Sequence, residues 1–222
     1  MKVSLLTSNQ RFRSEIDLVN LLFENGLELL HLKKRKFTKS KTKEYLNSVS
    51  KNHHNKIILH KHYWLAAKYK LKGIHLGRTE RRSPLKTAIK IFFLKLYHPK
   101  LQVTTSFHSL QSAQEDVKNY NHVILSPIFD SISKRNYSPA FSERQLISLF
   151  EKTKHNYYAL GGVDEAHVSM AKNIGFKGIL LYGSIWNAGD EKLKKFKSIV
   201  ALAKGEKKHI PEVKLKPVKI KI

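Results

Sequence analysis

The sequence predicts a (β/α)8 barrel, and three observations point to that fold. Eight short apolar runs of strand length recur along the 222 residues. Amphipathic segments of helix length separate these runs, which is the alternation expected of a parallel sheet built from β-α units. No glycine-rich dinucleotide-binding motif follows the first run, which weakens the alternative of an open doubly wound sheet. We therefore expect a single closed barrel.

The expected strands are short runs rich in Val, Ile, Leu and Tyr, bounded by polar or turn-forming residues. In chain order they cover residues 2–7, 27–33, 56–60, 73–76, 101–106, 122–125, 157–160 and 178–182. Their nearly continuous apolar character is typical of strands that are buried on both faces. These segments are expected to form the wall of the barrel.

The expected helices lie between the strands. In the first of them Leu18, Leu21 and Leu22 follow the i, i+3, i+4 spacing of one helix face, and Gly26 provides a stop signal. The predicted helices cover residues 16–24, 41–49, 63–69, 84–96, 110–119, 143–152, 164–174 and 191–203. We expect the barrel to occupy residues 1–204. Residues 205–222, in which Lys alternates with Val, Ile and Pro, are expected to form a short basic C-terminal tail.

Composition narrows the classes of function. The formal net charge is +25, which suggests nucleic acid as a partner, but lysine outnumbers arginine and is spread over almost every segment. No nucleic-acid-binding motif stands out, so we do not expect nucleic acid as a partner. No apolar run is long enough for a bilayer, and the first residues are too short for a signal peptide. We therefore expect the protein to be cytoplasmic. The absence of cysteine excludes disulfides and thiolate chemistry.

Two strand ends carry residues that suit phosphate. Residues 126–134 read Ser-Pro-Ile-Phe-Asp-Ser-Ile-Ser-Lys, and residues 158–163 read Tyr-Ala-Leu-Gly-Gly-Val. Serine hydroxyls and a lysine ammonium donate hydrogen bonds to an oxyanion, and glycines allow backbone N–H groups to approach it. Function in a barrel of this type is expected at the C-terminal strand ends, so the chain is expected to bind small phosphorylated substrates.

The polar motifs at the strand ends resemble those of the thiamine phosphate synthase and thiazole tautomerase superfamily. In order they are His-Leu-Lys-Lys-Arg at 31–35, Gly-Ile-His-Leu-Gly at 73–77, Ser-Phe-His-Ser at 106–109, residues 126–134, Ala-Leu-Gly-Gly-Val at 159–163 and Gly-Ser-Ile at 183–185. The resemblance covers about residues 1–203. It implies a transferase that joins hydroxymethylpyrimidine diphosphate to thiazole phosphate and releases diphosphate with the help of Mg²⁺.

The resemblance also assigns residues to roles. Lys33 and Arg35 would grip the diphosphate, together with Lys134, whereas His31 and Lys34 depart from the family pattern. The remaining substrate-binding positions, which would meet the pyrimidine or the thiazole phosphate, are His31, His60, Ser106, Ser131, Ser133, Gly162, Gly183 and Ser184.

The resemblance is weakest at the metal site. The family's Asn-Asp pair after the third strand is replaced by His60 and Lys61, and the second carboxylate falls on Glu80. Mg²⁺ prefers oxygen ligands, so an ammonium at a ligand position repels it. We therefore expect Lys61, with Lys34 adding to it, to replace the charge of the ion.

Histidines leave further alternatives open. His108 matches an acid/base histidine of the thiazole tautomerases, so tautomerase activity is one rival and His108 is a candidate catalytic residue. A non-catalytic barrel that binds a phosphorylated ligand or RNA is another. Zinc at His60, His62 and His75 is disfavoured because they lie on separate strands without nearby Asp or Cys. His75 is expected to be a hydrogen-bonded structural residue. The sequence leaves a homo-oligomer open.

Overall fold

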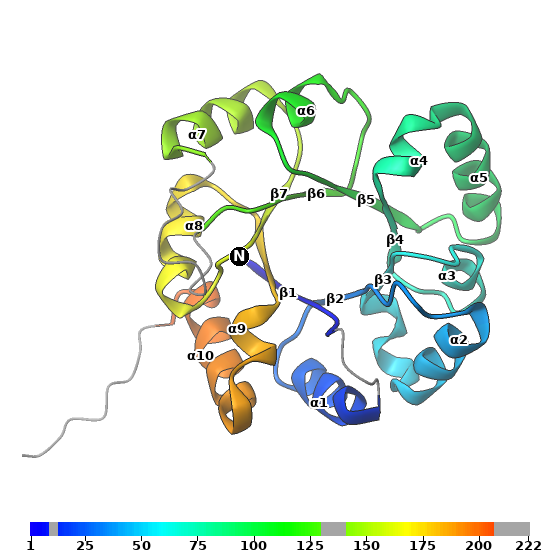
Figure 1. Cartoon of the computed structure of the whole chain (residues 1–222), viewed down its shortest axis with the longest axis horizontal. Helices are drawn as coiled ribbons and strands as arrows, with labels where there is room; N and C mark the ends of the chain where they lie inside the picture. The colour runs from blue at the N-terminus through cyan, green and yellow to red at the C-terminus, as the bar shows by residue number, and fades with distance from the viewer. Residues whose placement is uncertain (9–12, 130–140, 207–222) are drawn as a thin grey trace, which may run out of the picture.

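The chain folds into a closed barrel of eight parallel strands. The computed structural model describes residues 1–8, 13–129 and 141–206. Each strand pairs with the next in sequence, and the eighth pairs with the first. Figure 1 shows the strands as a ring with the helices outside it. The predicted (β/α)8 fold is confirmed.

The strands fall where the apolar runs predict them. They are β1 (Lys2–Leu6), β2 (Leu29–Leu32), β3 (Ile57–Leu59), β4 (Gly73–Leu76), β5 (Gln102–Phe107), β6 (His122–Leu125), β7 (Tyr157–Leu160) and β8 (Gly178–Leu181). The bounds of β4, β6 and β7 are those predicted, and the other strands differ by one or two residues at their ends. At those ends the chain turns out of the ladder.

The helices that surround the barrel are mostly those predicted. They are α1 (Arg13–Glu24), α2 (Lys39–Ser48), α3 (Trp64–Lys68), α4 (Arg78–Arg82), α5 (Pro84–Tyr97), α6 (Leu110–Glu115), α7 (Glu143–Lys152), α8 (Val168–Ile174), α9 (Gly183–Trp186) and α10 (Lys192–Lys204). The described residues also form the 3-10 turns η1 (Lys51–Lys56), η2 (Glu165–His167) and η3 (Gly189–Glu191).

The differences from the predicted helices have local causes. Helices α4 and α9 are too short to show an apolar period, and each begins directly after a barrel strand. Helix α6 ends early because Asp116 turns the chain. Its carboxylate accepts the backbone N–H of Lys118 at 3.0 Å and the hydroxyl of Tyr120 at 3.2 Å. Such local bonds compete with continued helix.

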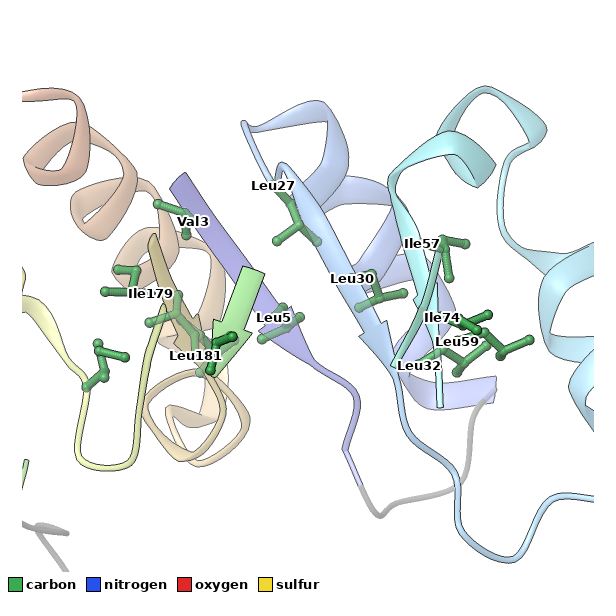
Figure 2. Close-up of a cluster of buried hydrophobic side chains, with 14 of the residues drawn as sticks. Val3, Leu5, Leu27, Leu30, Leu32, Ile57, Leu59, Ile74, Ile179 and Leu181 are labelled. Carbon is green, nitrogen blue, oxygen red and sulfur yellow. The ribbon is translucent and has the colours of Figure 1, made fainter. Parts of the chain in front are cut away.

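The core has two parts, because successive strand residues point to opposite sides of the barrel wall. One set packs outward against the helices, and Figure 2 shows members of it from β1 to β4 and β8. The other set fills the barrel interior and consists of Leu29, Ile58, Ile124, Tyr158 and Leu180. The interior is therefore a packed layer rather than a pore, as expected for this fold. The side chains that follow this layer toward the C-terminal strand ends form the floor of any site there.

The chain beyond the barrel is described only in part. Helix α10 ends at Lys204, and the next residue, Gly205, has a φ of 87°, the left-handed conformation common at helix ends. Residues 207–222 of the expected tail lie outside the described residues, so the tail and the boundary at 204 stay predictions. Along residues 1–8, 13–129 and 141–206, no helix is both long and apolar enough to cross a membrane.

Candidate active site at the C-terminal strand ends

A cavity of about 570 Å³ lies at the C-terminal ends of β1, β6, β7 and β8. Among its lining residues are Gly162, Gly183 and Ser184, which come from two different strand ends. These are three of the positions assigned to thiazole phosphate from the sequence. Lys195 of α10 also borders the cavity and supplies an amine that the sequence analysis did not single out.

The loop after β7 depends on its two glycines. Gly161 and Gly162 have φ values of 94° and 65°, in the left-handed region that favours glycine. A Cβ at Gly161 would lie 2.9 Å from the Cα of Pro127, so the loop after β6 packs directly on this backbone. The N–H of Phe129 donates to the carbonyl of Gly161 at 3.1 Å. The two predicted phosphate loops, after β6 and after β7, therefore pack against each other at the paired glycines.

The segment after β8 places at the cavity a hydroxyl group, that of Ser184, that could donate a hydrogen bond to a ligand. The Ser184 hydroxyl is buried and has no hydrogen-bond partner among the described residues. A buried hydroxyl without a partner costs about 1–3 kcal/mol, so a ligand that accepts its hydrogen bond would recover part of that cost. Trp186 fixes α9 in place, because its Nε1 donates to the Leu6 carbonyl at 2.7 Å.

The cations after β2 lie on another side of the mouth. Lys33 is half-buried, and burial lowers its pKa, with the charge of Arg35 adding to the effect. Its backbone N–H donates to the Thr7 hydroxyl at 2.9 Å. Arg35 is exposed, and its carbonyl accepts a hydrogen bond from Lys61 Nζ at 3.4 Å. The structure therefore brings Lys33, Arg35 and Lys61 together.

Lys34 does not join these cations. Its Nζ lies 2.9 Å from Glu15 Oε1 and donates to the Ser8 carbonyl at 2.8 Å. The two side chains of the ion pair are 5% and 2% exposed. Glu15 Oε2 accepts hydrogen bonds from both the N–H and the hydroxyl of Ser8. The expectation that Lys34 adds free positive charge at a metal position is wrong, because Glu15 neutralises it.

The described residues do not fit a Mg²⁺ site. Glu80, the expected carboxylate ligand, accepts the N–H of Gly77 at 3.1 Å and borders a groove against α5, outside the barrel. Lys61, at the position where the resemblance expects the other carboxylate ligand, carries an ammonium. Mg²⁺ is held by oxygen ligands in near-octahedral geometry, and this arrangement offers one carboxylate that already has a partner.

Histidines fill the barrel interior beneath the cations. His31 Nδ1 lies 3.1 Å from His60 Nε2, and His31 Nε2 lies 3.3 Å from His122 Nε2. The rings of His60 and His75 stack with their centroids 4.1 Å apart. Burial lowers the pKa of all four side chains, that of His122 to about 3, so they are neutral near pH 7.

The sequence analysis missed this convergence. It disfavoured metal binding because the histidines lie on separate strands, yet neighbouring strands in register bring them together. His62 is the exception, since its Nε2 bonds instead to the Phe37 carbonyl at 3.0 Å. The period-2 alternation was the available signal: His31 is two residues after the inward-facing Leu29, and His60 is two after Ile58.

The end of β5 contributes to the same interior. Ser106 Oγ lies 3.3 Å from His75 Nε2, and His75 is hydrogen-bonded as the sequence predicts. Arg81 Nη1 donates to the Thr105 hydroxyl at 2.7 Å and to the Ser106 carbonyl at 2.6 Å. Arg81 thereby fixes the strand end that carries Ser106, and no sequence pattern indicates this role.

His108 lies exposed at the mouth. Its Nδ1 donates to the Ser126 carbonyl at 2.8 Å, which leaves Nε2 as the unprotonated nitrogen of the neutral ring. Ser126 also lines the 570 Å³ cavity. Ser131, Ser133 and Lys134 lie outside the described residues. Their expected roles, and those of the other assigned residues, stay predictions.

The fold and this site together define a class of protein. Polar side chains, cations and glycines gather at the C-terminal strand ends of a (β/α)8 barrel, where barrel enzymes carry their active sites. Residues 3–185 match the family model described as thiamine monophosphate synthase. The chain belongs to this family.

Individual relatives agree with the family match. A thiamine-phosphate synthase of Prochlorococcus marinus is 28% identical over 147 residues, which are 65% of this chain and 40% of the relative. One of Caldicellulosiruptor bescii is 26% identical over 198 residues, 86% of each protein. The chain spans less than half the length of the three Prochlorococcus relatives it matches.

Solved structures of the same fold are similar along nearly the whole barrel. A thiamine phosphate pyrophosphorylase from Bacteroides thetaiotaomicron has a TM-score of 0.71 and 26% identity, covering 92% of this chain and 98% of that one. One from Pyrococcus furiosus also has a TM-score of 0.71, at 16% identity, with 92% and 96% covered. The second likeness supports the fold alone.

Proposed function

We propose that the protein joins hydroxymethylpyrimidine diphosphate to thiazole phosphate, forming thiamine phosphate and diphosphate in thiamine biosynthesis. The observation that carries this proposal is the cavity in which Gly162, Gly183 and Ser184 meet at the C-terminal strand ends. The family membership and the thiamine-phosphate synthases among the relatives support the same reaction.

The proposed reaction breaks one bond and forms one. The bond between the pyrimidine methylene carbon and the diphosphate oxygen breaks, and diphosphate leaves with the bonding electrons. The lone pair of the thiazole nitrogen then bonds to the methylene cation and gives the thiazolium product. Catalysis of such a step consists mainly of positioning and of stabilising the departing charge.

The residues divide these tasks between the two sides of the mouth. Lys33 and Arg35 would bind the departing diphosphate, together with Lys134. Gly162, Gly183 and Ser184 would hold the thiazole phosphate, with Ser131 and Ser133 completing that site. On the pyrimidine side, His31, His60 and Ser106 lie toward the barrel interior. Their nitrogens and hydroxyl would offer hydrogen bonds to the ring.

Lys61 would supply fixed positive charge where the family carries a Mg²⁺ carboxylate. It lies beside Arg35, so its ammonium is held near the proposed diphosphate site. Family members generally use Mg²⁺, but coupling by this chain is expected to need no added Mg²⁺. The assay is turnover in EDTA. Complete loss of turnover that Mg²⁺ alone restores would contradict this part of the proposal.

A matched pair of lysine variants tests the reaction itself. Lys33→Met is expected to lower kcat/KM by about 10²–10³-fold, the usual loss when a donor to developing negative charge is removed. Lys36→Met changes an exposed lysine three residues away and is expected to leave kcat/KM unchanged. Lys134→Ala is expected to abolish coupling. Soluble wild-type protein that neither couples the two precursors nor restores growth of a synthase-deficient strain without thiamine would refute the proposal.

A thiazole tautomerase is the second candidate, and the geometry of His108 favours it. The Ser126 carbonyl fixes the ring through Nδ1, so Nε2 is the ring nitrogen left to accept a proton from a substrate. Thiazole isomerisation that is lost in His108→Asn would support this reaction instead. If neither activity is found and RNA binds with a steep salt dependence, the chain would be a binding protein.

We also propose that the protein is cytoplasmic. We further propose that two or more copies of the chain associate through α5. Leu85, Phe92, Leu96 and Tyr97 of this helix are 73%, 61%, 60% and 66% exposed, and contiguous apolar surface of this kind marks contact sites. Light scattering is expected to give more than one chain per particle, and Phe92→Ser is expected to lower that number. A monomer at all concentrations would contradict it.

A further inference from the structure

The proposed reaction uses His31 and His60 only for hydrogen bonds and gives His75 no task, yet these histidines, from β2, the end of β3 and β4, converge in the barrel interior. His31, His60 and His75 each offer one ring nitrogen, and these nitrogens all lie within 4.8 Å of one another. Among the described residues, this is the one place where three or more potential metal ligands gather. Barrel interiors are usually filled by branched apolar side chains, so three imidazoles here call for a reason.

The spacing of the nitrogens suits a tetrahedral ion. Zinc lies about 2.0–2.1 Å from each imidazole nitrogen, which puts two ligand nitrogens roughly 3.3 Å apart. His31 Nδ1 and His60 Nε2 are 3.1 Å apart. The nearly parallel rings of His60 and His75 must fan apart to share one ion, and His60 follows the last residue of β3 rather than lying within the strand.

The neighbours of His75 fix it in a ligating tautomer. The Thr104 hydroxyl donates to the Ile74 carbonyl at 3.3 Å, so its oxygen accepts the proton of His75 Nδ1 at 3.0 Å. His75 Nε2 is then the nitrogen with the lone pair, which now faces the Ser106 hydroxyl at 3.3 Å and which an ion would take over from that hydroxyl. A hydrogen bond from the other ring nitrogen to an oxygen is the usual support of a metal-binding histidine.

His31 has a comparable arrangement. Its Nε2 lies 3.3 Å from His122 Nε2, which can accept the proton there and leave His31 Nδ1 to face His60. Burial lowers the pKa of all three histidines, so each is in the neutral form that binds metals. The charges of Lys33 and Arg81 reach the cluster and oppose a dication, so an anionic fourth ligand would help to offset them.

We propose that His31 Nδ1, His60 Nε2 and His75 Nε2 together bind one transition-metal ion of the zinc type. Three protein ligands leave a fourth position for water or an anion entering from the mouth. Imidazole nitrogen favours Zn²⁺ and Co²⁺, whereas Mg²⁺ requires oxygen. The site therefore differs from the family's Mg²⁺ site in its ligand atoms and its ion, although His60 stands at a position that the family's Asn-Asp pair occupies.

Cobalt and zinc provide the direct test, with the full chain first stripped by chelator and dialysed. We expect one Co²⁺ per chain, with visible d–d absorption that one equivalent of Zn²⁺ removes and a large excess of Mg²⁺ leaves unchanged. His60→Asn and His75→Gln should each lose this absorption. His54→Gln, a buried histidine bonded to the Leu46 carbonyl outside the cluster, should retain it.

A second variant separates ligation from folding. Thr104→Val removes the acceptor of His75 Nδ1 and keeps the side-chain shape, so Zn²⁺ affinity should fall by about 10–100-fold. Absorption that survives in His60→Asn and His75→Gln, no Co²⁺ spectrum in the wild-type protein, or displacement by Mg²⁺ would each overturn the site. The measurement uses no substrate, so its failure is distinct from failure of the proposed coupling reaction.

Discussion

Replacing Lys34 by methionine tests how the buried ion pair holds the cationic loop after β2. The change removes the ammonium opposite Glu15 and keeps most of the apolar stem. Glu15 would then keep its neutral partners Ser8 and Tyr45 but no cation, in a site where its side chain is 2% exposed. The carboxylate would lose its charge partner without gaining access to water.

The expected cost is large. Removing one partner of a buried ion pair typically destabilises a protein by about 3–5 kcal/mol, because the other charge stays buried. For a domain of 150–250 residues, 1 kcal/mol corresponds to roughly 2–4 °C in Tm. Lys34→Met should therefore lower Tm by about 6–20 °C. Lys36→Met, an exposed neighbour in the same loop, should change stability by no more than about 0.5 kcal/mol.

Urea and thermal unfolding followed by circular dichroism would measure both variants. The double variant Glu15→Leu with Lys34→Met should recover much of the stability lost in Lys34→Met, since no buried charge then lacks a partner. Equal losses of unfolding free energy in Lys34→Met and Lys36→Met would show that the ion pair does not stabilise the loop. The same conclusion would follow if the effects of Glu15→Leu and Lys34→Met were additive in the double variant.

Three further outcomes follow from other parts of the barrel. His122, with its folded pKa of about 3 against about 6.5 unfolded, favours the neutral form, so stability is full above pH 6.5 and falls as the pH drops toward 3. At pH 5 one such histidine lowers the free energy of unfolding by about 2 kcal/mol. In His122→Gln, the drop in unfolding free energy between pH 7 and pH 5, measured with urea, should be smaller by that amount. A drop as large as in the wild-type protein would contradict the low pKa of His122. Gly161→Ala should lower the free energy of unfolding more than Gly189→Ala does. Both glycines have a positive φ, but only at Gly161 would the added Cβ clash with Pro127. Equal urea midpoints for the two variants would refute this contact. Ser184→Ala should raise KM for thiazole phosphate while Tm stays level or rises; an unaltered KM would exclude the hydroxyl from the site.

The alternation of apolar runs and amphipathic segments was sufficient to predict the barrel, because both periods are properties of the sequence alone. The right-handed β-α connection limits the strand orders that are possible. A closed barrel rather than an open sheet was favoured because no dinucleotide-binding motif follows the first strand. The limits appear at short elements. Helices α4 and α9 have five and four residues, which is too few for an apolar period to be recognised.

Site residues were harder to predict, because a residue reaches the site only if its side chain points to the interior of the barrel at the strand end. Lys33 and Lys34 are adjacent, yet Lys33 lies near the interior histidines and Lys34 near Glu15 of α1. A charge run read along the sequence does not separate these two directions. Likewise, His31 and His60 meet only because β2 and β3 pair in one register, which is a tertiary property.

The bond from Trp186 to the end of β1 gives the protein a built-in optical reporter. The chain has two tryptophans, and Trp64 is 48% exposed whereas Trp186 is 9% exposed. A Trp64→Phe protein would fluoresce from Trp186 alone, whose neighbours Ser184 and Asn187 line the 570 Å³ cavity. Its emission would then follow occupancy of that cavity in real time, without a labelled ligand.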